Sequence, residues 1–163
     1  MPFTPFHWGP AALAGLIFSR VFYFPALLAA SVIIDIEPFS ILVFGLDYPL
    51  HGFFHSFPGG SLIAVFTSVV IYFFRNDINN LMRLFKLEQV SSFKKILWTS
   101  FFGVYLHILL DATIYGDMKP FYPAGINPFY GFFSAGQVYL FSGLSLLAAI
   151  IVYLVRIFFV KKN

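Results

Sequence analysis

The sequence predicts an all-α integral membrane protein, in which an N-terminal helical hairpin is followed by three transmembrane helices. Of its 163 residues, 60% are hydrophobic and only 10% are charged, too few to cover a water-facing surface with polar groups. Long apolar segments recur along the chain, and basic residues gather where these segments end. The length is that of one domain, so residues 1–163 are expected to form a single helical unit.

The N-terminal region is expected to form a hairpin of two helices, over residues 8–20 and 25–36. Both are short for a full crossing, which favours a tilted or re-entrant hairpin. Arg20, three aromatic residues and Pro25 interrupt the apolar run, and proline disfavours helical geometry in the residue before it. The alternative is one straight helix, which would hold His7 and Asp35 about 42 Å apart on opposite membrane faces. The hairpin brings both to the same side.

Three further segments are expected to cross the membrane, over residues 58–75, 95–115 and 135–160. The first begins at a proline-glycine-glycine breaker, the second follows two lysines, and the third ends at two lysines. A short segment, residues 48–57, precedes the first of these helices and carries the motif HGFFHS. Pro49 stands near its start, a position that the first turn of a helix tolerates.

The basic residues predict how the chain is oriented in the cell membrane. Cytoplasmic loops are enriched in lysine and arginine, so loop 75–95 and the C-terminal tail should be cytoplasmic. Arg20 in the hairpin turn fits the same side. The loop carries Arg75, Arg83, Lys86, Lys94 and Lys95. The histidine motifs and the 116–133 loop then fall on the non-cytoplasmic side.

Histidines and carboxylates at membrane depth predict a metal site, because ionisable groups there are costly and are usually functional. His107 and Asp111 are spaced i, i+4 and share a helix face, and His51 and His55 have the same spacing. Imidazole and carboxylate ligands suit a divalent ion such as Zn²⁺, and the absence of cysteine excludes thiolate ligands. The candidate ligands are His51, His55, His107, Asp111, His7 and Asp35.

Two acidic residues close the hairpin and are candidate catalytic groups. Asp35 and Glu37 are two residues apart, so a regular helix would not direct both at one ion. Pro38 is expected to move Glu37 out of helical geometry, so that the pair brackets a helix end. Glu37 would then serve as a general base or as a ligand of a second metal, and Asp35 as a ligand or a catalytic carboxylate.

The order of these motifs resembles the YdjM-like family of predicted membrane-bound metal-dependent hydrolases. Its members begin with a Met-Pro-Phe-Thr-like start and an early histidine, as in MPFTPFHWGPA. An acidic element, a His-Arg-Gly-x-Thr-His-Ser-like motif and a His-x-x-Leu-Asp helix follow, similar here to DIEP, HGFFHS and HILLDA. A late Pro-Phe element is similar to the NPF at 127–129, so that the resemblance spans roughly residues 1–130. Glu37 replaces an aspartate, and the central motif is one residue shorter and lacks the arginine.

These features favour a metal-dependent hydrolase that acts on a lipid-like ester or phosphoester at the non-cytoplasmic leaflet. A bound divalent ion would lower the pKa of its water toward about 7. The alternatives are a non-enzymatic protein with a structural metal site, and a divalent-cation or proton transporter, which lacks a matching ligand set at the cytoplasmic end. Carboxylates argue against haem. Membrane lipid is the expected partner, the basic residues form no nucleic-acid surface, and no pattern specifies an oligomeric state.

Overall fold

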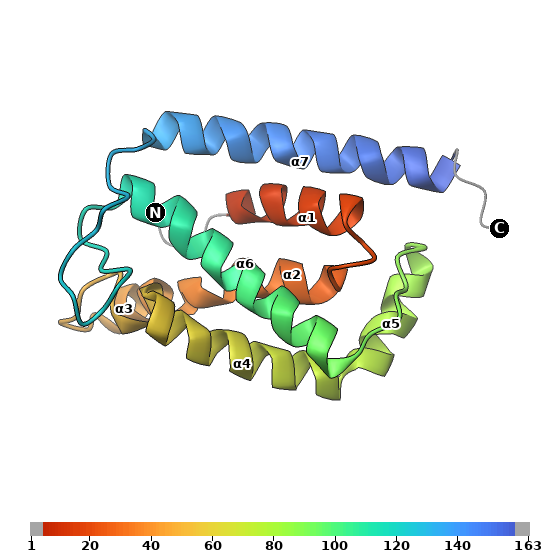
Figure 1. Ribbon diagram of the computed structural model, residues 1–163, viewed down its shortest axis with the longest axis horizontal. Helices are drawn as coiled ribbons and strands as arrows, with labels where there is room; N and C mark the ends of the chain where they lie inside the picture. Colours follow the sequence, from red (N-terminus) through yellow and green to blue (C-terminus); the bar gives the residue numbers. More distant parts are fainter. Residues whose placement is uncertain (1–4, 159–163) are drawn as a thin grey trace.

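The computed structural model describes residues 5–158, and within that range the chain is built from helices without strands (Figure 1). Three of the elements are short 3₁₀ helices, labelled η, and they end at His7, Asp35 and His55. In chain order the elements are η1 Pro5–His7, α1 Trp8–Ile17, α2 Phe24–Ala30, η2 Ile33–Asp35, α3 Ile36–Phe44, η3 Phe53–His55, α4 Phe57–Phe73, α5 Arg75–Leu84, α6 Phe93–Ile114 and α7 Ala135–Phe158.

The predicted N-terminal hairpin is confirmed, because α1 and α2 are separate helices joined by a turn over residues 18–23. The helix ends at Ile17, earlier than the predicted residue 20, and Tyr23 is extended before Pro25 enters the first turn of α2. The side chain of Gln89, in the segment after α5, hydrogen-bonds to the backbone of this turn. Its side-chain amide donates to the carbonyls of Ser19 and Phe22 at 2.6 and 2.9 Å. The turn is therefore fixed by a residue far away in the sequence.

The second limb of the hairpin is longer than the predicted 25–36. A 3₁₀ turn at Ile33–Asp35 joins α2 to α3, and the limb runs from Phe24 to Phe44, 21 residues in all. As predicted, a helix boundary lies between Asp35 and Glu37, because η2 ends at Asp35 and α3 begins at Ile36. The expectation that Pro38 moves Glu37 out of helical geometry was wrong, since Glu37 lies in the first turn of α3. Pro38 lies in the first turn of α3, where its missing N–H leaves no helical hydrogen bond unmade, so the helix can restart there.

The predicted short segment 48–57 is a loop with one 3₁₀ turn at Phe53–His55. Gly52 has a ψ of −147°, which is outside helical geometry. His51 and His55 therefore do not share a helix face. The loop ends at Ser56, whose hydroxyl accepts a hydrogen bond from the Gly59 N–H at 3.2 Å and caps α4.

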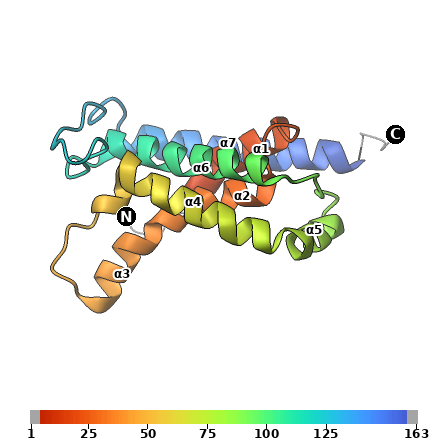
Figure 2. The same ribbon diagram turned by 60° about the horizontal axis from the view of Figure 1, so that its bottom comes forward.

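The long helices run alternately between the two ends of an elongated bundle (Figures 1 and 2). Helix α6 packs on α4 and α2, and α1 packs on α7. Within residues 5–158, three segments are long and apolar enough to cross a membrane, namely Phe24–Phe44, Phe93–Ile114 and Ala135–Phe158. Their length and composition indicate a multi-pass membrane protein. The predicted segments 95–115 and 135–160 correspond to α6 and α7, except that residues 159–160 and the predicted cytoplasmic tail lie outside the described residues.

Helix α5 lies inside the predicted loop 75–95 and was not expected. It follows α4, which corresponds to the predicted 58–75, and is bent from it by 73°. If the bent pair counts as one crossing, the number of candidate spans among the described residues is four. None of the residues of α5 is buried, and its apolar residues Ile78, Leu81, Met82 and Leu84 recur at helical spacing among polar ones.

We expect Gly9→Ala to destabilise the bundle by about 1–3 kcal/mol, as overpacking typically does. A Cβ atom at Gly9 would clash with the backbone carbonyl of Ser142, where α1 meets α7. Gly143→Ala is the matched control on α7, because a Cβ atom there meets nothing within 4 Å. The measurement is thermal unfolding of the purified variants in detergent. Equal melting temperatures for the two variants would contradict the close approach of α1 and α7.

Candidate metal centre

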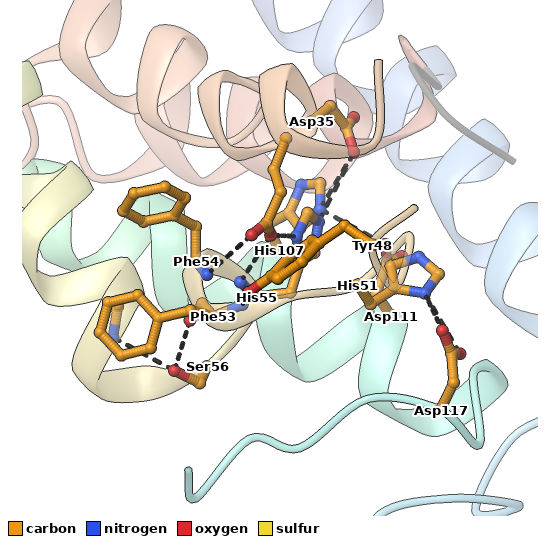
Figure 3. Close-up of polar contacts among 12 residues, drawn as sticks. Asp35, Tyr48, His51, Phe53, Phe54, His55, Ser56, His107, Asp111 and Asp117 are labelled. Carbon is orange, nitrogen blue, oxygen red and sulfur yellow. Dashed lines mark hydrogen bonds and ion pairs between the residues drawn. The ribbon is translucent and has the colours of Figure 1, made fainter. Parts of the chain in front are cut away.

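Four buried side chains from three segments converge at one end of the bundle. They are Asp35 at the end of η2, His55 in η3, and His107 and Asp111 on α6 (Figure 3). Each offers one ligand atom, and these atoms all lie within 4.8 Å of one another. We call these four residues the metal centre. They can hold a metal ion, as two imidazoles and two carboxylates suit a divalent cation.

Both histidines of the metal centre are oriented by hydrogen bonds on the far side of the ring. Nδ1 of His55 lies 2.7 Å from Oε2 of Glu37, and Nδ1 of His107 lies 2.8 Å from the carbonyl oxygen of Ser31. Both partners are acceptors, so each Nδ1 carries the hydrogen and donates it. The lone pair of each ring is then on Nε2, which faces the cluster. Metal-binding histidines are held in this way by a second layer of acceptors.

Three buried atoms of the metal centre lack hydrogen-bond partners among the described residues. They are Nε2 of His55, Nε2 of His107 and Oδ2 of Asp35. Nε2 of His107 lies 3.4 Å from Asp35 and 3.3 Å from Asp111, and Nε2 of His55 lies 3.9 Å from Asp35. Leaving buried polar atoms unpaired is costly. Separations of 3.3–3.9 Å between these atoms are compatible with ligands that each bond to one ion at about 2.0–2.2 Å.

Charge and protonation also favour a cation at this position. The carboxylates of Asp35 and Asp111 are both buried and both lie beside the His107 ring. A divalent ion would balance their negative charge. Burial lowers the pKa of His55 below its ordinary value, so its neutral form is favoured. The neutral imidazole is the form that binds metals.

His7 lies at the edge of the metal centre. Its Nε2 is 3.2 Å from Oδ1 of Asp111, and its ring stacks on His107 with centroids 4.0 Å apart. The hairpin therefore brings both His7 and Asp35 to the end of the molecule where α6 carries its polar pair. The structure gives His7 a contact with a carboxylate of the centre and does not group it with the four mutually adjacent ligand atoms.

His51, a predicted ligand, is turned toward a different partner. Its Nδ1 lies 3.0 Å from Oδ2 of Asp117 (Figure 3). Its ring packs against the rings of His55 and Tyr115. Sequence reasoning did not select Asp117. Its position six residues beyond Asp111, in a loop with little other charge, was the available signal. The hydrogen bond from His107 to the Ser31 carbonyl could not be predicted from the sequence, because every residue has a backbone carbonyl.

Glu37 is engaged with the segment that carries His55. Its carboxylate accepts hydrogen bonds from the backbone N–H groups of Phe54 and His55, each at 3.2 Å, and from the His55 ring. Three donors on one carboxylate occupy much of its accepting capacity. This arrangement favours a positioning role for Glu37 over the predicted roles of general base or ligand of a second metal.

No protein-family model, curated protein or solved structure matches this chain. The resemblance to the YdjM-like family therefore stays a prediction that rests on the motifs.

Replacing Glu37 by glutamine should weaken divalent-metal binding about 10–100-fold, the usual effect of losing an outer-layer partner of a ligand. The amide cannot accept from the His55 ring and both backbone N–H groups as a charged carboxylate does. Asp47→Asn is the matched control, since Asp47 is an exposed carboxylate three residues after α3. Competition with a chromogenic chelator measures the affinity of each variant. Equal affinities for the two variants would remove Glu37 from the site.

Proposed function

We propose that this protein is a membrane-embedded metal-dependent hydrolase, acting on an ester or phosphoester of a lipid-like substrate. The observation that supports it most is the pair of histidines whose Nδ1 atoms are occupied and whose Nε2 atoms face two buried carboxylates. Zn²⁺ is the ion we propose, because the donor set of imidazole and carboxylate is the one that catalytic zinc uses. When bound, it supplies Lewis acidity that activates water and polarises the substrate oxygen.

A cavity beside the metal centre provides room for a substrate. It has a volume of about 400 Å³ and includes His51, Asp117 and Lys119 in its lining. The size is within the range of small-molecule sites. Aromatic side chains from Tyr48, Phe53 and Tyr122 complete much of the wall and suit an apolar portion of a ligand. The ammonium group of Lys119 suits a negatively charged portion, which favours a phosphoester over a neutral acyl ester.

The His51–Asp117 pair is arranged to move a proton at the boundary between this cavity and the metal centre. Asp117 accepts from Nδ1 of His51, which leaves Nε2 as the atom that takes up or releases a proton. His51 can thus accept the proton of the attacking water and return it to the leaving alkoxide. Oriented carboxylate–histidine pairs serve as general bases in many hydrolases. We therefore assign the base role to His51 and the positioning role to Glu37.

We also propose that the metal centre faces the non-cytoplasmic side of the cell membrane. Arg20, Lys86 and Lys95 line one pocket at the other end of the bundle, as the orientation predicted from the basic residues requires. Loop 75–95 and the C-terminal end of α7 lie at that same end (Figure 1).

Two substitutions should separate metal binding from proton transfer. Asp111→Asn removes a charge that balances the cation, so purified protein should lose both bound metal and hydrolysis. His51→Gln should keep the metal and lower turnover by roughly 10²–10⁴-fold, as loss of a general base does. The measurements are metal content by elemental analysis and hydrolysis of a panel of lipid phosphoesters and esters. Wild-type protein that holds metal and cleaves nothing on the panel would instead indicate a structural metal site.

The orientation has its own test, because the chain contains no cysteine and any introduced thiol is unique. Asn80→Cys on α5 and Ile126→Cys in the loop before α7 are both at exposed positions. In intact cells, a membrane-impermeant maleimide should label position 126, and position 80 should react only after the membrane is opened. Labelling of position 80 in intact cells, with position 126 protected, would contradict the proposed orientation and indicate the opposite one.

A further inference from the structure

A basic pocket lies at the end of the bundle opposite the metal centre. It has a volume of about 490 Å³, within the range of ligand sites, and is built where α1 ends, α6 begins and the segment after α5 passes between them. Its lining includes the cationic residues Arg20, Lys86, Lys95 and Arg156. Glu88 is the one acidic residue in the lining, so positive charge prevails.

Two of these cations are held in place by neutral groups. Nζ of Lys95 donates to the carbonyl oxygen of Ser19, and Nη1 of Arg156 donates to that of Leu16, each at 3.0 Å. Both carbonyls belong to the C-terminal end of α1 or the residues just beyond it. A carbonyl takes up one donor and leaves the net charge of the cation unchanged. The remaining donors of the ammonium and guanidinium groups can therefore serve an anionic ligand.

An apolar groove adjoins the basic pocket and shares three of its lining residues, Leu16, Phe24 and Leu87. The groove has a volume of about 290 Å³ and extends between α1, α5 and α7. Its far end includes the exposed side chains of Leu146 and Ile150 on α7. A ligand that fills both spaces has an anionic head and an apolar tail.

We propose that the basic pocket and the apolar groove together bind an anionic phospholipid. The phosphate lies among Arg20, Lys86, Lys95 and Arg156, and an acyl chain follows the groove beside α7. Basic pockets between helices at a membrane surface recognise lipid headgroups by charge and by arginine–phosphate hydrogen bonds. This site is separate from the metal centre and goes beyond the proposed hydrolase function, since it needs neither metal nor catalysis.

The test compares two variants that each lose two positive charges. Arg20→Gln with Lys86→Gln removes the two exposed cations of the pocket, whereas Lys95 and Arg156 are left in place because they bond to the backbone. Arg83→Gln with Lys94→Gln is the matched control, since both residues are exposed, lie in the same region and do not line the pocket. Full-length proteins in detergent are titrated with dioleoyl phosphatidylglycerol, and binding is followed by native mass spectrometry.

The wild-type protein should retain phosphatidylglycerol in preference to zwitterionic phosphatidylcholine. At about fivefold per basic residue, the pocket variant should bind phosphatidylglycerol about 30-fold more weakly than the control variant does. Soluble glycerol phosphate or inorganic phosphate at equal concentration should not displace the lipid, because neither fills the groove. Equal retention of the two lipids, equal affinity of the two variants, or displacement by the soluble phosphates would each overturn the proposal.

Discussion

The cost of burying two carboxylates and two imidazoles at the end of an apolar bundle is the constraint on which this structure depends. Asp35, His55, His107 and Asp111 are almost completely enclosed, and one buried atom each of Asp35, His55 and His107 lacks a hydrogen-bond partner among the described residues. Such atoms are tolerated only if something pairs with them. A divalent cation meets the requirement of all four at once, which is why the metal explains the cluster better than a hydrogen-bonded network does.

The irregular parts of the chain are the parts that build this cluster. Regular α-helices dominate the membrane-depth segments, whereas the 3₁₀ turns η2 and η3 end at Asp35 and His55. The two 3₁₀ turns place the side chains of Asp35 and His55 in the cluster. At η3 the backbone N–H groups of Phe54 and His55 have no helical partner and donate to the Glu37 carboxylate instead. Residues His107 and Asp111 need no break, because one turn of α6 already places both on the same face. Rigid α6 therefore offers half of the ligands, and the turns bring the others to it.

Much of this arrangement could be predicted from the sequence, where the signal was local. The turn before Pro25 placed His7 and Asp35 at one end, and the i, i+4 spacing placed His107 beside Asp111. The prediction that His51 and His55 share a helix face was wrong, because the i, i+4 spacing has meaning only inside a helix and Gly52 is not in helical geometry. The contacts of Glu37 with His55, and of His51 with Asp117, join segments distant in sequence, and no local pattern encodes them.

The central claim is that these side chains bind one divalent ion, and X-ray absorption at the metal edge of the purified protein tests it most directly. The account predicts stoichiometric metal with two imidazole nitrogens at about 2.0–2.1 Å and carboxylate oxygens at about 2.0–2.2 Å. His107→Ala should remove one imidazole from the spectrum, whereas His51→Ala should leave both. A metal with only oxygen neighbours, or protein purified without bound metal that also fails to take up added Zn²⁺, would contradict it.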